Sequence, residues 1–260
     1  MKPKVLVAAP TSKEHSYVID EYLRTVRDFS YDNFDTYLVD TSYPFDRKFH
    51  QKLKKSSDFV SRLVWNPKSE HTLQMLARAR EKIRQFFVQH REYSFLFFLD
   101  TDVIAPRDSI ERLISHDKDC VGFLVHCFTG KRKTPAVWHN GFITVGKGLS
   151  FYTWEEIKAA NGKLLKVYAT SIACLMVKRK VLEQTAFRTH PTFIFGEDLW
   201  WFAEVNDKGF EMYCDTSVRA VHKNKDKNSI NVYKTPKVWV AFGLFDEKVK
   251  KYNVEMLVRS

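Results

Sequence analysis

Short apolar runs alternate with segments of helical spacing over the first hundred residues, and this alternation limits the chain to few folds. The apolar runs cover residues 5–9, 34–39, 60–65 and 95–99. Residues 17–29 and 73–87 carry apolar side chains at three- and four-residue intervals, which is typical of amphipathic helices. Strands that alternate with helices predict a parallel sheet with right-handed crossovers. We therefore expect an α/β fold with a mostly parallel central sheet flanked by helices.

The pattern changes after residue 119, and we expect a mixed second half. Strand character returns in residues 121–127, 136–145, 167–177 and 211–221, which loops separate more than long helices do. A helix is predicted over residues 197–207, with Gly209 as its stop signal. The lysine-rich residues 223–227 indicate a boundary. We expect one domain over residues 1–222 and a basic, aromatic C-terminal extension over residues 223–260.

Composition bounds the possible functions without selecting one. The 260 residues are 44% hydrophobic, which is enough for a sizeable core. No apolar run approaches the roughly 18 to 20 residues of a membrane-spanning helix, and no signal-peptide core follows Met1, so a cytoplasmic location is expected. The net charge of +11 favours anionic partners, although a solvated lysine-rich surface explains it equally well. The four cysteines lack paired spacing and are expected to be buried free thiols.

The motif with the clearest chemistry is Asp100-Thr101-Asp102, which directly follows the most apolar run. Ligands of open parallel sheets bind at the carboxyl ends of the strands. Two carboxylates one residue apart can hold a hard divalent cation and a ribose hydroxyl, and the cation can bridge diphosphate oxygens. A helix cap or a solvated turn is the alternative for such a short motif taken alone. Its position after a buried strand favours the binding interpretation.

A second acidic pair, Glu197-Asp198, begins the helix that contains Trp200 and Trp201. A carboxylate fixed beside aromatic walls can accept the proton of an attacking hydroxyl as a general base, and Asp198 is the candidate for this role, with Glu197 beside it. Trp200 is a candidate for stacking on a sugar. The structural alternative is that acidic residues favour the positive end of a helix and that the tryptophans belong to the core.

His222 ends the last strand-like run of the predicted domain. A neutral imidazole there can complete a metal site begun by Asp100 and Asp102. Single histidines often have no role in metal binding, so the sequence leaves both interpretations open.

These residues together resemble the GT-A fold glycosyltransferases, and most closely the large inverting family that includes cellulose synthase. The resemblance covers residues 3–222 and depends on Asp100-Thr101-Asp102 followed by Gly196-Glu197-Asp198 with its tryptophans. It implies a Rossmann-like GT-A sheet. The further residues that it places on the nucleotide sugar are Pro10, Thr11, Asp40, Asn66, Arg78 and Arg80.

The activity implied by the resemblance is transfer of a hexose from a nucleotide diphosphate sugar to a hydroxyl acceptor, with inversion. Asp198 would be the base, and Mn²⁺ or Mg²⁺ would be held by Asp100, Asp102 and His222. The donor would be linked to UDP or GDP, and the acceptor would be a sugar, a protein or a lipid-linked molecule. Two departures are Asp40-Thr41 in place of a double aspartate and the absence of the Q-x-x-R-W signature of processive polymerases. The second departure favours transfer of a single sugar.

Two other functions remain open at this point. A sugar-phosphate nucleotidyltransferase has a related sheet but normally a glycine-rich basic loop after the first strand, which residues 10–13 do not provide. A polyanion or nucleic-acid binding protein would explain the charge, but no nucleic-acid module is evident, and no specific nucleic acid is expected as a partner. The aromatic and basic residues of the extension predict either peripheral contact with a membrane surface or packing against the domain.

Overall fold

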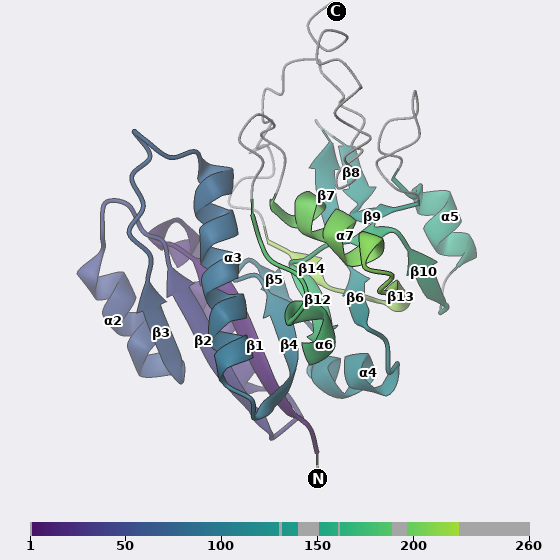
Figure 1. The fold of residues 1–260 in the computed structure, drawn as a ribbon, viewed down its shortest axis with the longest axis horizontal. Helices are drawn as coiled ribbons and strands as arrows, with labels where there is room; N and C mark the ends of the chain where they lie inside the picture. The colour runs from purple at the N-terminus through teal and green to yellow at the C-terminus, as the bar shows by residue number, and fades with distance from the viewer. Residues whose placement is uncertain (1, 130–131, 140–150, 161, 189–196, 224–260) are drawn as a thin grey trace, which may run out of the picture.

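An eight-stranded sheet between two layers of helices forms the centre of the molecule (Figure 1). The computed structural model describes residues 2–129, 132–139, 151–160, 162–188 and 197–223. The strands of the sheet are β1 (Lys4–Thr11), β2 (Phe34–Asp40), β3 (Phe59–Arg62), β4 (Tyr93–Leu99), β6 (Cys120–Leu124), β10 (Leu164–Val167), β12 (Cys174–Lys178) and β13 (Met212–Arg219). Shorter strands pair outside it: β5 (Val103–Ile104), β7 (His126–Thr129), β8 (Arg132–Pro135), β9 (Val137–Trp138), β11 (Ala169–Thr170) and β14 (Val221–His222).

The helices are η1 (Lys13–Tyr17), α1 (Ile19–Arg27), α2 (Arg47–Ser56), α3 (Thr72–Gln89), α4 (Ser109–Ser115), α5 (Trp154–Ala159), α6 (Arg179–Leu182) and α7 (Glu197–Asp207). Among the described residues, no helix is both long enough and apolar enough to cross a membrane. All four cysteines are free thiols, and three of them are fully buried, which agrees with their apolar sequence context.

The strand order is β10-β13-β6-β12-β4-β1-β2-β3. Strands β4, β1, β2 and β3 are parallel to one another, as the alternation of the first hundred residues predicts. Strand β12 is antiparallel to both of its neighbours, and β13 returns parallel to β6. The mostly parallel sheet and the mixed second half are both confirmed.

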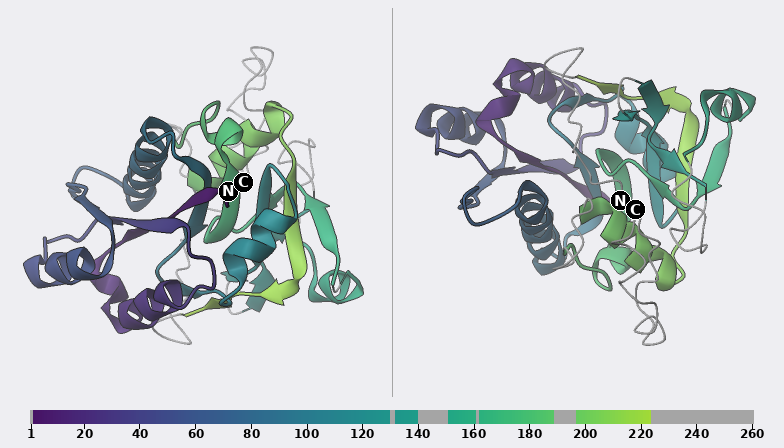
Figure 2. Two further views of the ribbon diagram at one scale, coloured as in Figure 1. Left: turned by 90° about the horizontal axis from the view of Figure 1, so that it is seen from below. Right: turned by 90° about the horizontal axis from the view of Figure 1, so that it is seen from above.

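The two faces of the sheet carry different helices. On β1, Leu6 and Ala8 pack with the core that includes α3 and α7, whereas Val5, Val7 and Ala9 pack with the core that includes α1, α2 and α4. This division follows from the alternation of side chains along a strand. Figure 2 shows α3 and α1 on opposite sides of the strands. Because both faces are covered, the strands read as continuous apolar runs.

Several predicted strands of the second half are wrong in their extent. Residues 167–177 comprise the last residue of β10, the whole of β11 and most of β12. The Ser171 hydroxyl accepts a hydrogen bond from Ala173 N and turns the chain between β11 and β12. Residues 121–127 divide at Val125, where the chain leaves the main sheet for the β7–β8 hairpin. Residues 211–221 divide between β13 and β14. Part of the expected strand 136–145 lies outside the described residues.

The predicted helix over residues 197–207 is confirmed as α7. Gly209 follows it with a φ of +76°, the left-handed conformation that glycine adopts at low cost after a helix. The C-terminal extension lies outside the described residues except for Lys223. Lys223 still contacts the domain, since its amide donates to Asp102 O at 2.7 Å and its ammonium lies 2.8 Å from a carboxylate oxygen of Glu21.

Candidate active site

The carboxyl ends of β2, β1 and β4 lie side by side at one edge of the sheet. Thr41 N donates to Thr11 O at 2.8 Å, and the hydroxyls of Thr11 and Thr101 lie 3.0 Å apart. Asp100 follows β4 directly, and its amide donates to Ala173 O at 3.0 Å, so the neighbouring β12 fixes where the motif begins. The Asp100-Thr101-Asp102 motif is therefore positioned by backbone contacts with neighbouring segments.

Asp102 and His222 face each other across the β5–β14 ladder. Val103 pairs with His222 in that ladder, and His222 Nε2 lies 3.1 Å from Asp102 Oδ2. His222 Nδ1 donates to the carbonyl oxygen of His126 at 3.0 Å, which fixes the orientation of the ring. Burial alone lowers the pKa of His222, but the hydrogen bond and charge of Asp102 outweigh it and raise that pKa to about 9. The same interaction lowers the pKa of Asp102 against the opposing effect of burial.

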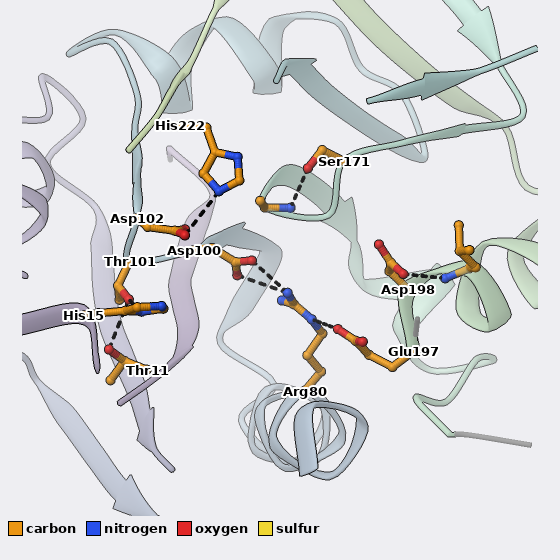
Figure 3. A network of polar contacts seen from close by, with 12 residues as sticks. Thr11, His15, Arg80, Asp100, Thr101, Asp102, Ser171, Glu197, Asp198 and His222 are labelled. Carbon is orange, nitrogen blue, oxygen red and sulfur yellow. Dashed lines mark hydrogen bonds and ion pairs between the residues drawn. The ribbon is translucent and has the colours of Figure 1, made fainter. Parts of the chain in front are cut away.

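Arg80 of α3 joins two of the predicted acidic sites. Its Nη2 donates to Asp100 Oδ1 at 3.1 Å and Oδ2 at 2.9 Å, and its Nε donates to Glu197 Oε1 at 2.9 Å (Figure 3). The Arg80 side chain is only 4% exposed. Its Nη1 is also buried and has no hydrogen-bond partner among the described residues. Burial lowers the pKa of Arg80, but the two carboxylates raise it above its ordinary value, so the guanidinium stays charged.

Glu197 and Asp198 have different surroundings although they are adjacent at the start of α7. Glu197 is buried and bound by Arg80. Asp198 is partly buried, and its Oδ1 accepts a hydrogen bond from Leu199 N at 2.8 Å. Burial and the negative charge of Glu197 raise the pKa of Asp198 to about 7, although Arg80 acts in the opposite direction. Asp198 is thus the member of the pair whose carboxylate has a poorly stabilised negative charge.

The three predicted segments meet in one network. Figure 3 shows Asp102 and His222 on one side of Arg80, and Glu197 and Asp198 on the other. Arg80 connects them through Asp100, which follows the same strand as Asp102.

The Asp102 and His222 pair is compatible with a divalent metal ion. Octahedral coordination at about 2.1 Å places neighbouring ligand atoms about 3 Å apart, and the two facing atoms are 3.1 Å apart. Among the described residues, no group of three His, Cys, Asp or Glu side chains gathers around one point. Asp100 could contribute to such a metal site only through lone pairs that its hydrogen bonds with Arg80 leave unused.

His15 belongs to this site and has no signal in the sequence that identifies it. Its Nδ1 lies 2.6 Å from the hydroxyl of Thr101, between the two carboxylates of the motif. Tyr17 of the same short helix donates its hydroxyl hydrogen to Lys223 O at 2.8 Å. Three residues lie between the end of β1 and His15, and nothing in that spacing predicts the contact.

Three of the predicted nucleotide contacts are closed to a ligand in this arrangement. Pro10 and Thr11 are not in a loop but are the buried last residues of β1, in register with Val39 and Asp40. The Asp40 side chain is fully buried, and both of its oxygens already have protein partners. These corrections have one cause: β1 and β2 extend farther than the apolar runs indicate.

Asn66 and Arg78 lie together but apart from the acidic network. Both line a hollow of about 920 Å³ on the outer side of α3, whose lining includes none of Asp100, Asp102, Asp198 or His222. The Arg78 guanidinium is 2.7 Å from Glu70 and therefore has a partner other than a diphosphate. Arg78 and Arg80 are two residues apart on a helix, so they face different directions.

Trp200 does not form the expected aromatic wall, because it is only 6% exposed and belongs to the core. Trp201 is fully buried, and its indole N–H donates to the hydroxyl of Thr185 at 2.9 Å. The structural alternative for the tryptophans is the correct one.

The chain matches no protein-family model and no curated protein sequence. Comparison of folds finds GalNAc-T7, solved with UDP, GalNAc and Mn²⁺, at a TM-score of 0.57 and 14% identity over 87% of this chain and 45% of that one. S. aureus TarS 1-349 aligns at a TM-score of 0.51 and 14% identity over 84% of this chain and 59% of that one. A197 from STIV aligns at a TM-score of 0.45 and 17% identity over 86% of this chain and 87% of that one.

This chain spans less than two thirds of the GalNAc-T7 and TarS structures that it matches. At these identities the similarity establishes the fold, and the predicted GT-A fold is confirmed. Membership of the inverting family that includes cellulose synthase stays a prediction.

Proposed function

We propose that the protein is a metal-dependent glycosyltransferase that moves a hexose from a nucleotide diphosphate sugar to a hydroxyl acceptor with inversion. The observation that carries the proposal is the arrangement at the carboxyl edge of the sheet, where Arg80 binds both Asp100 and Glu197 and His222 faces Asp102. Asp198 directly follows Glu197 in the chain. The GT-A fold supports it, since ligands of open α/β sheets bind at this edge. One fold can host many functions, so the residues of the site carry more weight than the fold does.

Asp102 and His222 would hold the metal ion, and Asp100, whose two oxygens both accept from Arg80, could add a remaining lone pair. When bound, the ion would neutralise charge on the leaving diphosphate. The imidazole ligand favours Mn²⁺ over Mg²⁺, which prefers oxygen ligands. His222 Nδ1 donates to a backbone carbonyl, which leaves Nε2 as its ligating atom. The structure of GalNAc-T7, which has a similar fold, was solved with Mn²⁺.

Asp198 would act as the general base. As the acceptor oxygen attacks the anomeric carbon, the bond from that carbon to the diphosphate oxygen breaks and the hydroxyl proton passes to an Asp198 oxygen. The raised pKa of Asp198 suits this task, because a base with a pKa near the working pH accepts a proton readily. Arg80 would position the site by holding Asp100 and Glu197, and its enclosed Nη1 offers one further hydrogen bond.

The proposed donor is linked to UDP or GDP, and the proposed acceptor is a sugar, a protein or a lipid-linked molecule. A cytoplasmic location and peripheral membrane contact through residues 223–260 stay predictions, because that extension lies outside the described residues.

The donor can be identified before the acceptor is known. We expect the full-length chain to hydrolyse one of the UDP-, GDP- or dTDP-linked sugars slowly to free sugar and nucleoside diphosphate when Mn²⁺ is present. EDTA should stop the reaction, because Asp102 and His222 alone leave the diphosphate charge uncompensated. Chromatography of the released nucleotide measures it. A chain that neither hydrolyses any of these donors nor binds UDP, GDP or dTDP would contradict the proposal.

Replacing Asp102 with alanine should remove most of the metal dependence of nucleotide binding. In the wild type, Mn²⁺ should increase the affinity for the cognate nucleoside diphosphate. In Asp102→Ala this increase should be smaller by a factor of about ten or more, because one ligand atom is lost. Calorimetric titration with and without Mn²⁺ measures both affinities. Asp108→Ala is the matched control, since Asp108 is an exposed carboxylate paired with Arg112 on the next helix. An equal effect of Mn²⁺ in the Asp102→Ala variant and the wild type would exclude this metal site.

A further inference from the structure

Two connections at the β3 end of the sheet expose apolar side chains next to each other. Six large hydrophobic side chains of the described residues are exposed, and three of them lie here: Tyr43 and Phe45 between β2 and α2, and Val64 after β3. Their exposed fractions are 44%, 37% and 69%. The Tyr43 ring lies 6.1 Å from the ring of Trp65, so the two connections are side by side. The three side chains therefore belong to one apolar group at the surface.

Basic side chains surround this apolar group. Arg47 and Lys48 lie in the first turn of α2, and Arg62 ends β3 with its guanidinium 3.9 Å from the centre of the Phe45 ring. All three basic side chains are exposed, and none of them has an ion-pair partner among the described residues. Asp46 subtracts one charge, but its carboxylate caps α2 by accepting a backbone hydrogen bond. The group as a whole stays positive.

The stability of α2 does not explain these charges. The N-terminus of a helix carries a partial positive charge, so acidic side chains are favoured in its first turn and basic ones are not. Helix α2 has the opposite arrangement, and its ten residues include no aspartate or glutamate. Its exposed basic residues stand at positions 47, 48, 54 and 55, a spacing that puts them on one face of the helix. Such a face is complementary to a negatively charged surface outside the molecule.

The group lies toward the edge of the sheet that carries the candidate active site. Tyr43 follows the carboxyl end of β2 and Val64 follows that of β3, and both strands are parallel to β1 and β4. Asp100 follows the carboxyl end of β4. Figure 1 shows α2 and β3 at one end of the sheet and α5 at the other. A partner bound to the group therefore approaches the carboxyl edge of the sheet.

We propose that this group is a docking surface for a membrane that contains anionic lipids, and we call it the basic tip: Tyr43, Phe45, Arg47, Lys48, Arg62 and Val64. Anionic headgroups attract lysine and arginine, and exposed aromatic and aliphatic side chains enter the boundary between headgroups and acyl chains. Nucleic acid would also attract the cations, but an aliphatic side chain offers its bases no stacking surface. The centres of protein interfaces are depleted of lysine. The inference does not depend on the proposed activity.

Co-sedimentation with vesicles tests the charges of the basic tip. The full-length wild type is compared with the double variant Arg47→Gln, Lys48→Gln on vesicles of phosphatidylcholine with and without phosphatidylserine. The matched control is Lys158→Gln, Lys163→Gln, which removes the same charge from exposed positions in and after α5, at the other end of the sheet. Thermal unfolding checks the fold. The first double variant should unfold no earlier than the wild type, because two cations leave the positive end of a helix.

We expect the wild type to bind the anionic vesicles at least about tenfold more tightly than the neutral ones, and added salt should reduce this difference. Arg47→Gln, Lys48→Gln should bind the anionic vesicles about tenfold or more weakly than the wild type, since each basic side chain near such a surface contributes about fivefold. The control should bind within about twofold of the wild type, because its charges lie far from the bilayer. Equal losses in the two double variants, or no preference of the wild type for anionic vesicles, would overturn the inference.

Trp65 allows a second measurement that locates the contact. Because its ring lies beside that of Tyr43, lipids with brominated acyl chains should quench part of the tryptophan fluorescence when the basic tip enters the bilayer. Trp65→Phe should lose this quenching. Trp239→Phe, which removes the tryptophan of the C-terminal extension, should keep it. The reverse result would overturn the inference and assign the contact to the extension.

Binding of single-stranded RNA covers the other polyanion that could occupy the basic tip. The wild type should bind RNA more weakly than it binds the anionic vesicles at the same salt concentration. Tighter binding of RNA, with the same loss in Arg47→Gln, Lys48→Gln, would overturn the inference and assign the surface to nucleic acid. Either result would leave the proposed activity in place, because the basic tip contains none of the residues proposed to hold the metal ion or to act as the base.

Discussion

Replacing Asp198 with asparagine should lower the rate of sugar transfer by about 10²- to 10⁴-fold, the usual contribution of a general base. The amide is nearly the same size and can still accept the hydrogen bond from Leu199 N, so the start of α7 should keep its geometry. What it cannot do is take up the proton of the acceptor hydroxyl. Initial rates with saturating donor measure the change, and calorimetry should find nucleotide affinity within about twofold of the wild type.

Asp207→Asn is the control for this substitution, because Asp207 is an exposed carboxylate at the other end of α7. It should transfer sugar at the wild-type rate. The division of roles between base and metal site predicts that Asp102→Ala loses nucleotide affinity and Asp198→Asn does not. Equal losses of affinity in the two variants would contradict that division.

The wild-type rate should also depend on pH in a defined direction. Burial and Glu197 raise the pKa of Asp198 to about 7, so the carboxylate that accepts the proton is the minor form below that pH and the major form above it. Transfer should therefore rise through neutral pH and fall about tenfold for each unit below it. Asp198→Asn should lose this inflection, and its survival in the variant would assign the ionisation to another group.

Replacing Arg80 with methionine should lower the free energy of unfolding by about 3–5 kcal/mol, which is typical when one partner of a buried ion pair is removed. The loss leaves Asp100 and Glu197 near each other without the guanidinium that both contact. Methionine keeps much of the apolar stem, so the change measures the charge more than the packing. Urea unfolding followed by tryptophan fluorescence measures the difference.

Arg78→Met is the matched control, two residues away on the same helix. Arg78 is half exposed and pairs with Glu70 at the surface, so its loss should cost less than about 1 kcal/mol. The double variant Arg80→Met, Glu197→Gln should recover part of the lost stability, because it removes one of the two uncompensated charges. Equal destabilisation by Arg78→Met and Arg80→Met would show that Arg80 has no special place in the structure.

The parallel half of the fold could be predicted because its signals are local. Each apolar run of the first hundred residues overlaps a strand, although β3 ends at Arg62 and not at residue 65, and the helical spacing of residues 73–87 marks α3. The strands of the second half are harder to predict from the sequence, because where they end depends on contacts with residues far away in the chain. The break at Ser171 and the departure at Val125 are made by turns and pairings that no periodicity encodes.

The candidate site divides in the same way. Asp100, Asp102 and Asp198 stand at the ends of recognisable elements, and the pairing of β14 with β5 brings His222 to Asp102. Arg80 was expected at a diphosphate, but it contacts Glu197 from 117 positions away, a partner that the helix pattern does not reveal. Asp40 was expected to contact the nucleotide, but its Oδ2 is already bound by His50, ten positions farther along the chain. Such contacts follow from the tertiary structure and have no sequence spacing of their own.

The β5–β14 ladder also sets an order of events during synthesis. The imidazole that faces Asp102 comes from a position 120 residues later, so a growing chain has its first carboxylates long before it has this partner. On the ribosome, the nascent polypeptide can assemble β1 to β4 while the proposed metal site still lacks His222. If Asp102 and His222 hold a metal ion as proposed, the chain would gain that ability only after His222 has been translated.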